Sequence, residues 1–385
     1  MTDKPQFVEE RGQKVKLNNL CSRGKSSLRQ KDVSNDGPYA VYGASGLVGT
    51  MASFQNAVPY VAVVKDGAGV GRASACEANT SVLGTMQALI PSEGIDRDYL
   101  LHLVRSLHLG DGFSGSTIPH IYFKDYGKLP VRLHSPAEQK RIVDIFASIE
   151  RQIKVSKQQL DQLDFLVKSR FIEMFGDPVE ENRWARITLA SLCTKLGSGA
   201  TPRGGKAAYK TSGIPLIRSM NVHNGYFESK DLAYIDEIQA KKLDNVTLHK
   251  GDVLLNITGA SVARSCLLPD YLAGGRVNQH VSIVRCDPNR MLPRVLNSIF
   301  TSDSYQRFLL EHSRMAGATR EAITKDDLET MTVPLPPLSL QYKFAAFVAQ
   351  VDKSRFIDLR NEIQILLLPR DRRHGQFQFL NHSKV

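Results

Sequence analysis

The most regular pattern in the chain is a run of apolar residues near its middle that alternate at spacings of four and three. This pattern predicts a long helix that packs along a second helix, and its persistence over about four to five heptads disfavours the alternative of a surface helix on a globular core. We place this first spacer helix at residues 136–177, because the closing sequence Phe175-Gly-Asp-Pro178 combines a glycine stop with a proline. The predicted seam consists of Ile142, Phe146, Ile149, Ile153, Leu160, Leu163 and Val167.

A second helix of the same kind is predicted near the C-terminus, over residues 338–367, after another proline-bearing link. Its Phe344, Val348 and Val351 occupy places that match the first seam, so it is the expected partner helix. Beyond these positions polar residues replace the seam and the apolar residues continue out of phase, which predicts a shortened helix. The tail, residues 368–385, lacks helical patterning, and both a disordered and a divergent C-terminus are consistent with it.

The remaining sequence is globular in character, with short β-type runs such as Tyr60–Val64 in the first part and 252–257 and 280–284 in the second. Glycine, asparagine and aspartate turn signals bound these runs. We therefore predict an α+β protein with a mixed domain over residues 1–135 and another over 178–337, each followed by one of the long helices.

The two parts are copies of each other. The matched segments are 15–21 with 187–193, 67–72 with 259–264, and 115–117 with 317–319, followed by single matches such as Val131 with Val333 and Gln139 with Gln341. The offset between the copies grows in steps from 172 to 192 to 202, as loop insertions in the second copy would cause. Chance similarity would not keep the same order at three places, so the sequence indicates an internal duplication.

Composition adds a polyanion as the expected partner, since the net charge is +11 and the pI about 9.4. The first helix, with seven basic and seven acidic residues, is neutral and suits a spacer better than a DNA-gripping helix. The five cysteines form no metal-binding pair, so we interpret them as reduced thiols of a cytoplasmic protein. No apolar run approaches the length of a membrane span, and no secretory signal is visible.

Motifs that would indicate catalysis fail in detail. Residues 67–71 resemble a dinucleotide-binding loop, but Arg72 stands where the third glycine belongs. Residues 199–206 approach a nucleotide-binding P-loop with incorrect spacing, and Ala207 replaces the serine or threonine that would hold Mg²⁺. The proline-rich loop that holds the target amine in amino-methyltransferases is missing. The sequence therefore predicts a non-catalytic chain without a metal site.

Several sequence segments closely resemble segments of the specificity subunits of type I restriction-modification systems. They are Gly197-Ser-Gly-Ala-Thr-Pro202, Gly213-Ile-Pro-Leu-Ile-Arg218, Gly251-Asp-Val-Leu-Leu-Asn-Ile-Thr-Gly-Ala260, Val277-Asn-Gln-His280, Ala137-Glu-Gln-Lys-Arg-Ile142 and Met174-Phe-Gly-Asp-Pro178. The likeness extends from about residue 14 to 366 and is stronger in the second copy. The altered second helix and the tail depart from it.

The resemblance implies two target-recognition domains in tandem, each reading one half of a split site in double-stranded DNA. It implies that the long helices pack as an antiparallel coiled coil with pseudo-twofold symmetry and set the gap between the half-sites. It further implies two separate methyltransferase subunits that modify adenine N6 with S-adenosylmethionine, and translocase or restriction subunits that use ATP and Mg²⁺. The chain itself would bind no cofactor and no membrane, and a scaffold that no longer binds DNA is the alternative.

Proteins read DNA sequence at base edges mainly with basic and amide side chains. The candidate DNA-binding residues are therefore the side chains of these types in polar loops beside glycine. In the first copy they are Lys25, Arg29, Lys31, Lys65, Arg72, His120 and Lys124. In the second copy they are Arg203, Lys206, Arg218, Arg264, Asn278, Gln279, His280 and Arg320. Arg72 and Arg264 are the strongest candidates, because both copies keep them. Matched residues, however, fit phosphate contacts or fold determinants as well as base readers. Base readers should differ between the copies.

Overall fold

The computed structural model describes residues 12–113, 118–202, 204–315 and 321–366, and for 206, 207, 315 and 356–366 the backbone alone. The chain divides into two compact units, the first formed by residues up to 156 with those from 361 onward, and the second by 157–360. The long helix α3 begins in the first unit and ends in the second. Each unit is described by itself.

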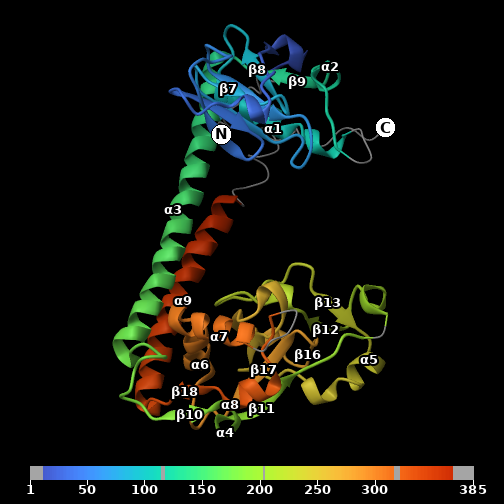
Figure 1. Ribbon diagram of the computed structural model, residues 1–385. Helices are drawn as coiled ribbons and strands as arrows, with labels where there is room; N and C mark the ends of the chain where they lie inside the picture. The colour runs from blue at the N-terminus through green and yellow to red at the C-terminus, as the bar shows by residue number, and fades with distance from the viewer. Residues whose placement is uncertain (1–11, 114–117, 203, 316–320, 367–385) are drawn as a thin grey trace, which may run out of the picture. The chain divides into compact units, whose positions relative to one another are not determined.

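The strands of the first unit are β1 (Gln13–Lys16), β2 (Cys21–Arg23), β3 (Tyr39–Gly43), β4 (Gly46–Met51), β5 (Tyr60–Val64), β6 (Ala73–Cys76), β7 (Ser81–Val82), β8 (Met86–Pro91) and β9 (Pro130–Leu133). Its helices are η1 (Leu17–Asn19), η2 (Gln30–Asp32), α1 (Arg97–Ser106), η3 (Leu109–Asp111), α2 (Phe123–Tyr126) and the start of α3 (Pro136–Phe175). They form an α+β unit (Figure 1). Helix α1 packs against β5 and β6.

The strands of the second unit are β10 (Arg186–Thr188), β11 (Cys193–Ser198), β12 (Ile214–Ile217), β13 (Ala233–Ile235), β14 (Val253–Asn256), β15 (Ser265–Leu267), β16 (Arg276–Val277), β17 (Val281–Cys286) and β18 (Thr332–Pro334). Its helices are α4 (Leu189–Leu192), η4 (Gly205–Ala208), η5 (Ser219–Asn221), α5 (Glu237–Lys241), η6 (Asp244–Val246), η7 (Gly259–Ser261), η8 (Asp270–Leu272), α6 (Pro293–Thr301), α7 (Asp303–Met315), α8 (Lys325–Thr330) and α9 (Leu338–Leu366). Helix α6 packs on β14 and β15, as α1 does on β5 and β6.

The sheets of the two units have the same strand order. A four-stranded sheet runs β2-β8-β5-β6 in the first unit and β11-β17-β14-β15 in the second. A three-stranded sheet runs β4-β3-β7 and β13-β12-β16, and in both it contains one parallel pair. A two-stranded ribbon joins β1 to β9 and β10 to β18, so that Val15 faces Val131 as Ile187 faces Val333. The duplication predicted from the sequence is confirmed by this topology.

The core of each unit lies around its central strand. All five residues of β5 and all four of β14 are buried, because other strands flank them and a helix covers the sheet. Such strands read as continuous apolar runs. This is the pattern by which the sequence indicated them.

The repeated glutamine at the start of each long helix has a structural role. Gln139 is buried, its side-chain oxygen accepts from the Asp96 amide at 2.9 Å, and its Nε2 donates to the Gly94 and His134 carbonyls. Gln341 does the same with the Leu292 amide at 2.8 Å and the carbonyls of Arg290 and Pro336. Each glutamine thereby joins the helix start to the loop before α1 or α6 and satisfies backbone groups that are costly to leave unpaired.

Helix α3 ends at Phe175, two residues before the predicted bound of 177, and the glycine of the predicted stop follows it directly. Gly176, the residue after its last turn, has φ +78° and donates its amide hydrogen to the Ile172 carbonyl at 2.8 Å. A left-handed residue at this position ends a helix, and glycine adopts it without steric cost. The Trp184 indole then donates to the Phe175 carbonyl at 2.8 Å, which fixes the turn that follows.

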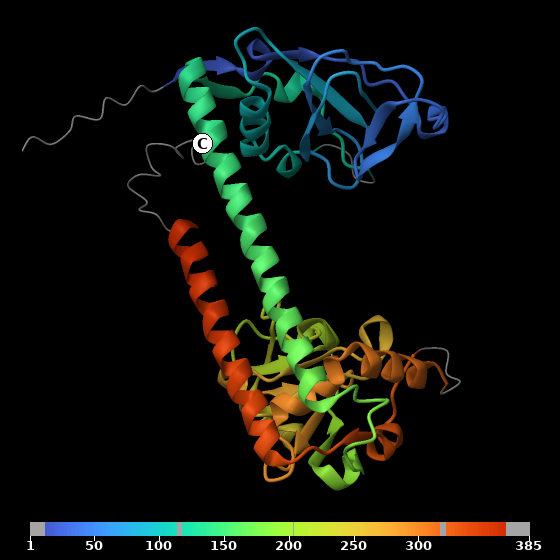
Figure 2. The ribbon, with the colours of Figure 1, turned by 90° about the vertical axis from the view of Figure 1, so that its left-hand side faces the viewer.

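Within the second unit α9 packs on the last turns of α3 (Figures 1 and 2). Phe344 lies 5.6 Å from Phe171 and 5.5 Å from Phe175 between ring centroids, Arg170 lies over the Phe347 ring, and Arg355 pairs with Asp164 farther along. As residue numbers rise in α9 they fall in α3, so this stretch is antiparallel.

The seam positions divide according to what surrounds them. Ile142 packs against the core of the first unit, and Phe146 stacks on His102 of α1 at 4.2 Å, so both residues have partners in the first unit. Ile149 and Leu160 are partly buried, and Ile153 is exposed. Phe344, Val348 and Val351 are buried, and the first two share one core cluster with helices α6 and α7, against which Val167 also packs.

Candidate nucleic-acid interface

Each unit carries the same turn after its central strand. Residues 64–72 form it in the first unit and residues 256–264 in the second, and we call it the shared turn. The amide of Val64 donates to the Arg72 carbonyl at 2.8 Å, as the Asn256 amide does to the Arg264 carbonyl at 2.8 Å. The matched Gly-x-x-x-x-Arg segments of the sequence therefore encode one backbone structure.

Two positions of this turn are left-handed in both units. They are Gly67 and Gly71 in the first unit, with φ +83° and +84°, and Gly259 and Ala263 in the second, with φ +75° and +72°. The turn leads into β6 or β15 and not into a helix, whereas a dinucleotide-binding loop requires strand, turn and helix. The rejection of such a loop at residues 67–71 agrees with this geometry.

A second segment crosses the shared turn in both units. In the first unit the Gly67 amide donates to the Pro119 carbonyl at 2.9 Å, and the Ile121 amide donates to the Lys65 carbonyl at 2.9 Å. In the second unit the Gly259 amide donates to the Glu321 carbonyl at 3.1 Å, and the Ile323 amide to the Ile257 carbonyl at 2.8 Å. The crossing segments bring residues 118–124 and 321–326 beside the turns, from more than 50 residues away along the chain.

The side chains on this common backbone differ between the units. In the first unit His120 Nδ1 lies 2.8 Å from Asp66 Oδ1, and the His120 ring stacks on Tyr122. The Lys124 ammonium lies 5.3 Å from the centre of the Tyr122 ring, which is itself 48% exposed. The first unit thus presents an exposed aromatic ring flanked by a basic group.

In the second unit three loops meet beside the turn. The Thr258 hydroxyl pairs with His280 Nδ1, His280 Nε2 lies 3.0 Å from Gln279 Nε2, and the Thr201 hydroxyl pairs with Gln279 Oε1. Asn278 is buried, and its side-chain oxygen accepts from the His280 amide at 3.1 Å. Gln279 is exposed, so the second unit presents an amide beside its turn, whereas the first unit presents the Tyr122 ring.

Arg72, one of the two strongest candidates from the sequence, stabilises the turn. Its guanidinium donates to the carbonyls of Gly69 and Ala44, both at 3.3 Å, which closes the turn on the neighbouring hairpin of β3 and β4. The Arg72 amide also donates to the Gly69 carbonyl at 3.1 Å, and the Arg264 amide donates in the same way to the Ser261 carbonyl at 3.3 Å. Of the interpretations that the sequence left open for this pair, the structure favours the fold determinant for Arg72.

The remaining candidates are dispersed. Arg29 is exposed and forms a two-pronged pair with Asp32, and these hydrogen bonds hold the pKa of the Asp32 carboxyl below its ordinary value. Arg218 donates to the Asp231 carbonyl and lies over the Tyr209 ring at 5.3 Å. Lys25 and Lys31 are exposed between β2 and β3, whereas Lys65 is the second residue of the shared turn. Arg203, Arg320 and the tail 368–385 lie outside the described residues, as does the side chain of Lys206.

Sequence reasoning missed four side chains of these clusters. They are Asp66, Tyr122, Thr201 and Thr258. A signal for two of them existed, because Asp66 and Thr258 directly precede the matched Gly67 and Gly259, where the copies align best. Thr201 gave no such signal, since its contact with Gln279 spans 78 residues.

Two absences hold for the part of the chain that the structure describes. No group of three or more histidine, cysteine or acidic residues there could hold a metal ion. No helix there is long and apolar enough to cross a membrane. The five cysteines are free, and burial raises the pKa of the Cys21, Cys193, Cys266 and Cys286 thiols to about 12, so none of these four is an activated nucleophile.

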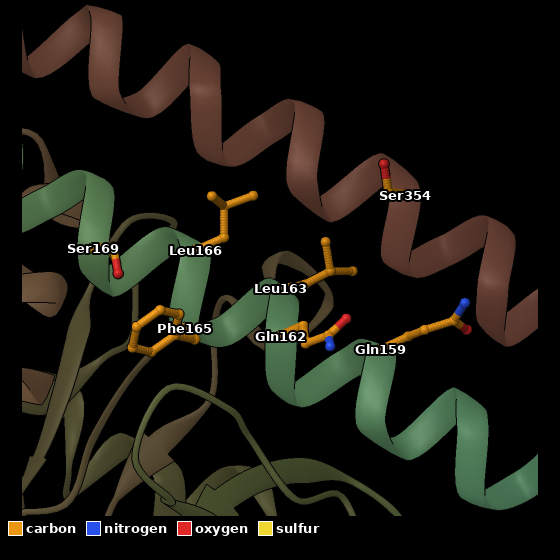
Figure 3. Close-up of a pocket in the computed structure, with 7 residues that line it drawn as sticks. All are labelled: Gln159, Gln162, Leu163, Phe165, Leu166, Ser169 and Ser354. Atoms are coloured by element: carbon orange, nitrogen blue, oxygen red, sulfur yellow. The ribbon is translucent and has the colours of Figure 1, made fainter.

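Helices α3 and α9 border a shallow cavity of about 490 Å³ in the second unit. Figure 3 shows Leu163, a predicted seam residue, and Leu166 projecting from α3 toward α9. Phe165 also borders the cavity and is 71% exposed. The helix pair therefore keeps apolar surface uncovered in this chain alone.

Curated proteins resemble this chain in sequence, and solved structures resemble it in fold. It is 21% identical to the StySPI specificity subunit of Salmonella potsdam and to the MjaVIII specificity subunit of Methanocaldococcus jannaschii, over 69% of the chain in each case. These alignments span 60% and 66% of the two relatives. The EcoKI specificity subunit of Escherichia coli is 26% identical over 44% of the chain and 38% of its own length.

Among solved structures, the S subunit of the type I system of M. genitalium has a TM-score of 0.58 and 13% identity, with full coverage of both chains. A structure from a study of type I complex assembly and conformational transition has a TM-score of 0.53 and 16% identity, and covers 98% of this chain and 100% of its own. The family described as type I restriction modification DNA specificity domain matches residues 9–164 and 181–367. That match covers most of both units and agrees with the resemblance found in the sequence, and the chain therefore belongs to this family of specificity subunits, which are not themselves catalytic.

Proposed function

We propose that this chain recognises a bipartite site in double-stranded DNA, with each unit reading one half. The observation that carries the proposal is the shared turn, one backbone repeated in two units with different side chains at matched positions. A scaffold that repeats one binding surface would keep the same side chains, whereas two readers of different half-sites need different ones. Family membership supports the same function.

The chemistry of the two clusters fits base recognition. An exposed tyrosine beside a lysine can stack on a base or lie along the backbone, and an oriented amide can exchange two hydrogen bonds with a base edge. Side chains that donate to backbone carbonyls, such as Arg72, would instead stabilise the turn. The net charge of +11 supplies the long-range attraction to DNA.

We further propose that α3 and α9 act as a spacer between the half-sites and as a docking surface for two methyltransferase subunits. The exposed Phe165 and Leu166 support a partner that covers the helix pair. S-adenosylmethionine would be bound by the methyltransferases, and ATP and Mg²⁺ by restriction subunits that join the complex in the cytoplasm. We also propose that a pseudo-twofold symmetry relates the two units.

Selection from a pool of random duplexes tests the proposal. The chain, assembled with its methyltransferase partner, should enrich two short motifs separated by a fixed number of unspecified base pairs. Mapping methylated adenines in a host genome with and without the gene should return the same motif. Selection without any bipartite motif would contradict DNA specificity and favour the alternative, a scaffold that no longer binds DNA.

The spacer proposal has a separate test. Insertion of one heptad between residues 152 and 163 should change the number of unspecified base pairs and leave the letters of both half-sites unchanged, because the seam register is preserved. Altered half-site letters would contradict the role of α3 as a spacer.

A further inference from the structure

We propose that Gln279 reads an adenine in the half-site of the second unit, and that Thr201 and His280 fix its amide for this contact. The inference rests on the proposed function and deepens it. It assigns one base class to one side chain and divides the cluster into a reading residue and two positioning residues.

Hydrogen bonds to Thr201 and His280 hold the amide of Gln279 at both of its polar atoms. The Thr201 hydroxyl donates to Gln279 Oε1, while Gln279 Nε2 lies 3.0 Å from His280 Nε2 and donates to it. With Nε2 of His280 accepting, its Nδ1 carries the hydrogen that is given to the Thr258 hydroxyl. A flipped amide would accept from the other tautomer of His280 and donate to the Thr201 hydroxyl, and it would likewise keep one acceptor and one donor unused.

Counting hydrogen-bond capacity identifies the base. An amide oxygen has two acceptor positions and an amide nitrogen has two hydrogens. Thr201 and His280 occupy one of each, which leaves Gln279 one acceptor and one donor on its exposed side. Adenine presents the complement in the major groove, a donor at N6 and an acceptor at N7, whereas guanine presents two acceptors and cytosine a donor.

The backbone holds this amide in place. The Asn278 carbonyl accepts from the Gly199 amide at 3.1 Å, and the Asn278 amide donates to the Ile217 carbonyl at 3.0 Å. A Cβ at Gly199 would lie 1.8 Å from the Val277 carbonyl oxygen, so only glycine allows the two loops to approach so closely. The close approach brings Thr201 within reach of Gln279.

The first unit lacks this network, which makes the inference testable within one molecule. The amide of Lys65 donates to the Thr85 carbonyl at 3.0 Å, as the Ile257 amide does to the His280 carbonyl at 3.0 Å, so Thr85 stands where the second unit has His280. The residue before it is Gly84, which has no amide side chain. Changes to Gln279 should therefore alter one half-site only.

The experiment is duplex selection and methylation mapping with the assembled complex of wild type, Gln279→Glu and Gln279→Ala. Glutamate keeps the acceptor and loses the donor, so the preference for adenine at one position should fall by roughly ten- to a hundred-fold, with cytosine gaining. Alanine should lose the preference without a new one. Asn182→Asp, which changes an exposed amide on another loop of the same unit, should leave both half-sites unchanged.

Positioning by Thr201 is tested with a matched pair. Thr201→Ser keeps the hydroxyl and should keep the adenine preference, whereas Thr201→Val has the same shape without the hydroxyl and should weaken that preference more than it weakens total DNA binding. An unchanged second half-site in Gln279→Glu, or a change in the first half-site, would overturn the inference. If wild type selects no bipartite motif, the proposed function itself fails, which is a different result.

Discussion

The two units of this chain share a backbone and differ in what they display on it. The same pairs of amides and carbonyls close the shared turn and hold the crossing segment in both. At matched places one unit has Asp66, His120 and Tyr122, and the other has Thr258, Ala322 and Thr324. The difference teaches that the backbone is a frame common to both copies, and that base recognition can change without change to the frame.

The largest contrast is expected where the long helices begin. Phe344 is fully buried among aromatic rings, and its counterpart in the first unit, Ile142, is only partly buried. Phe344→Ala should cost about 3–5 kcal/mol of unfolding free energy, and Ile142→Ala at most about 2 kcal/mol. Denaturant unfolding followed by the fluorescence of Trp184, the single tryptophan, measures the cost of Phe344→Ala in the second unit. Hydrogen exchange in α1 measures the cost of Ile142→Ala. Equal costs would contradict this contrast and show that the two helix starts contribute equally to the free energy of unfolding.

The shared turn gives the next contrast. A Cβ at Gly71 would lie 2.2 Å from the Gly110 amide nitrogen at φ +84°, so Gly71→Ala should destabilise the first unit by about 1–3 kcal/mol or more. Ala263→Gly relieves a left-handed alanine at φ +72° but removes a buried methyl group, so its net effect should stay within about 1 kcal/mol. Thermal unfolding of both variants checks this, and a tolerated Gly71→Ala would contradict the rigidity of the frame.

A smaller effect is expected at the exposed ring of the first unit. Tyr122→Ala should weaken binding of duplexes that carry the first half-site by about 1 kcal/mol, since base stacking on an aromatic ring contributes about 1–3 kcal/mol in single strands. Tyr122→Phe keeps the ring and should bind normally. Binding titrations against duplexes with either half-site altered distinguish this role, and equal loss for both half-sites would argue against it.

The smallest effect concerns pH. Burial lowers the pKa of His102 and His134 below the ordinary 6.5, so the folded first unit favours their neutral forms. The unfolded chain takes up these protons as pH falls through about 6.5, which means that this part of the stability is present above that pH and is lost below it. Ser298 and Pro336 occupy the matching places in the second unit. Hydrogen exchange at pH 7.5 and 5.5 should show faster opening of α1 than of α6 at the lower pH, and His102→Leu should reduce the difference.

Much of the frame could be predicted from the sequence, because it is encoded in local signals. The heptad spacing and the glycine at 176 predicted a helix over residues 136–177, and the structure ends it at Phe175, directly before that glycine. The repeated Gly, Arg and Gln positions revealed the duplication, since each has a role in the backbone: Gly67 adopts left-handed φ, Arg72 closes the turn and Gln139 anchors the helix.

The functional clusters depended on tertiary structure. Thr201 reaches Gln279 only because β11 pairs with β17 and the loops beyond these strands meet. Phe146 joins the first unit because α1 packs beside α3, and heptad spacing cannot distinguish a globular core from a second helix as the apolar partner. Sequence by itself thus determined the repeated frame, whose signals are local. Folding decided which side chains face each other, because hydrogen bonds and ring contacts depend on distance in space and not along the chain.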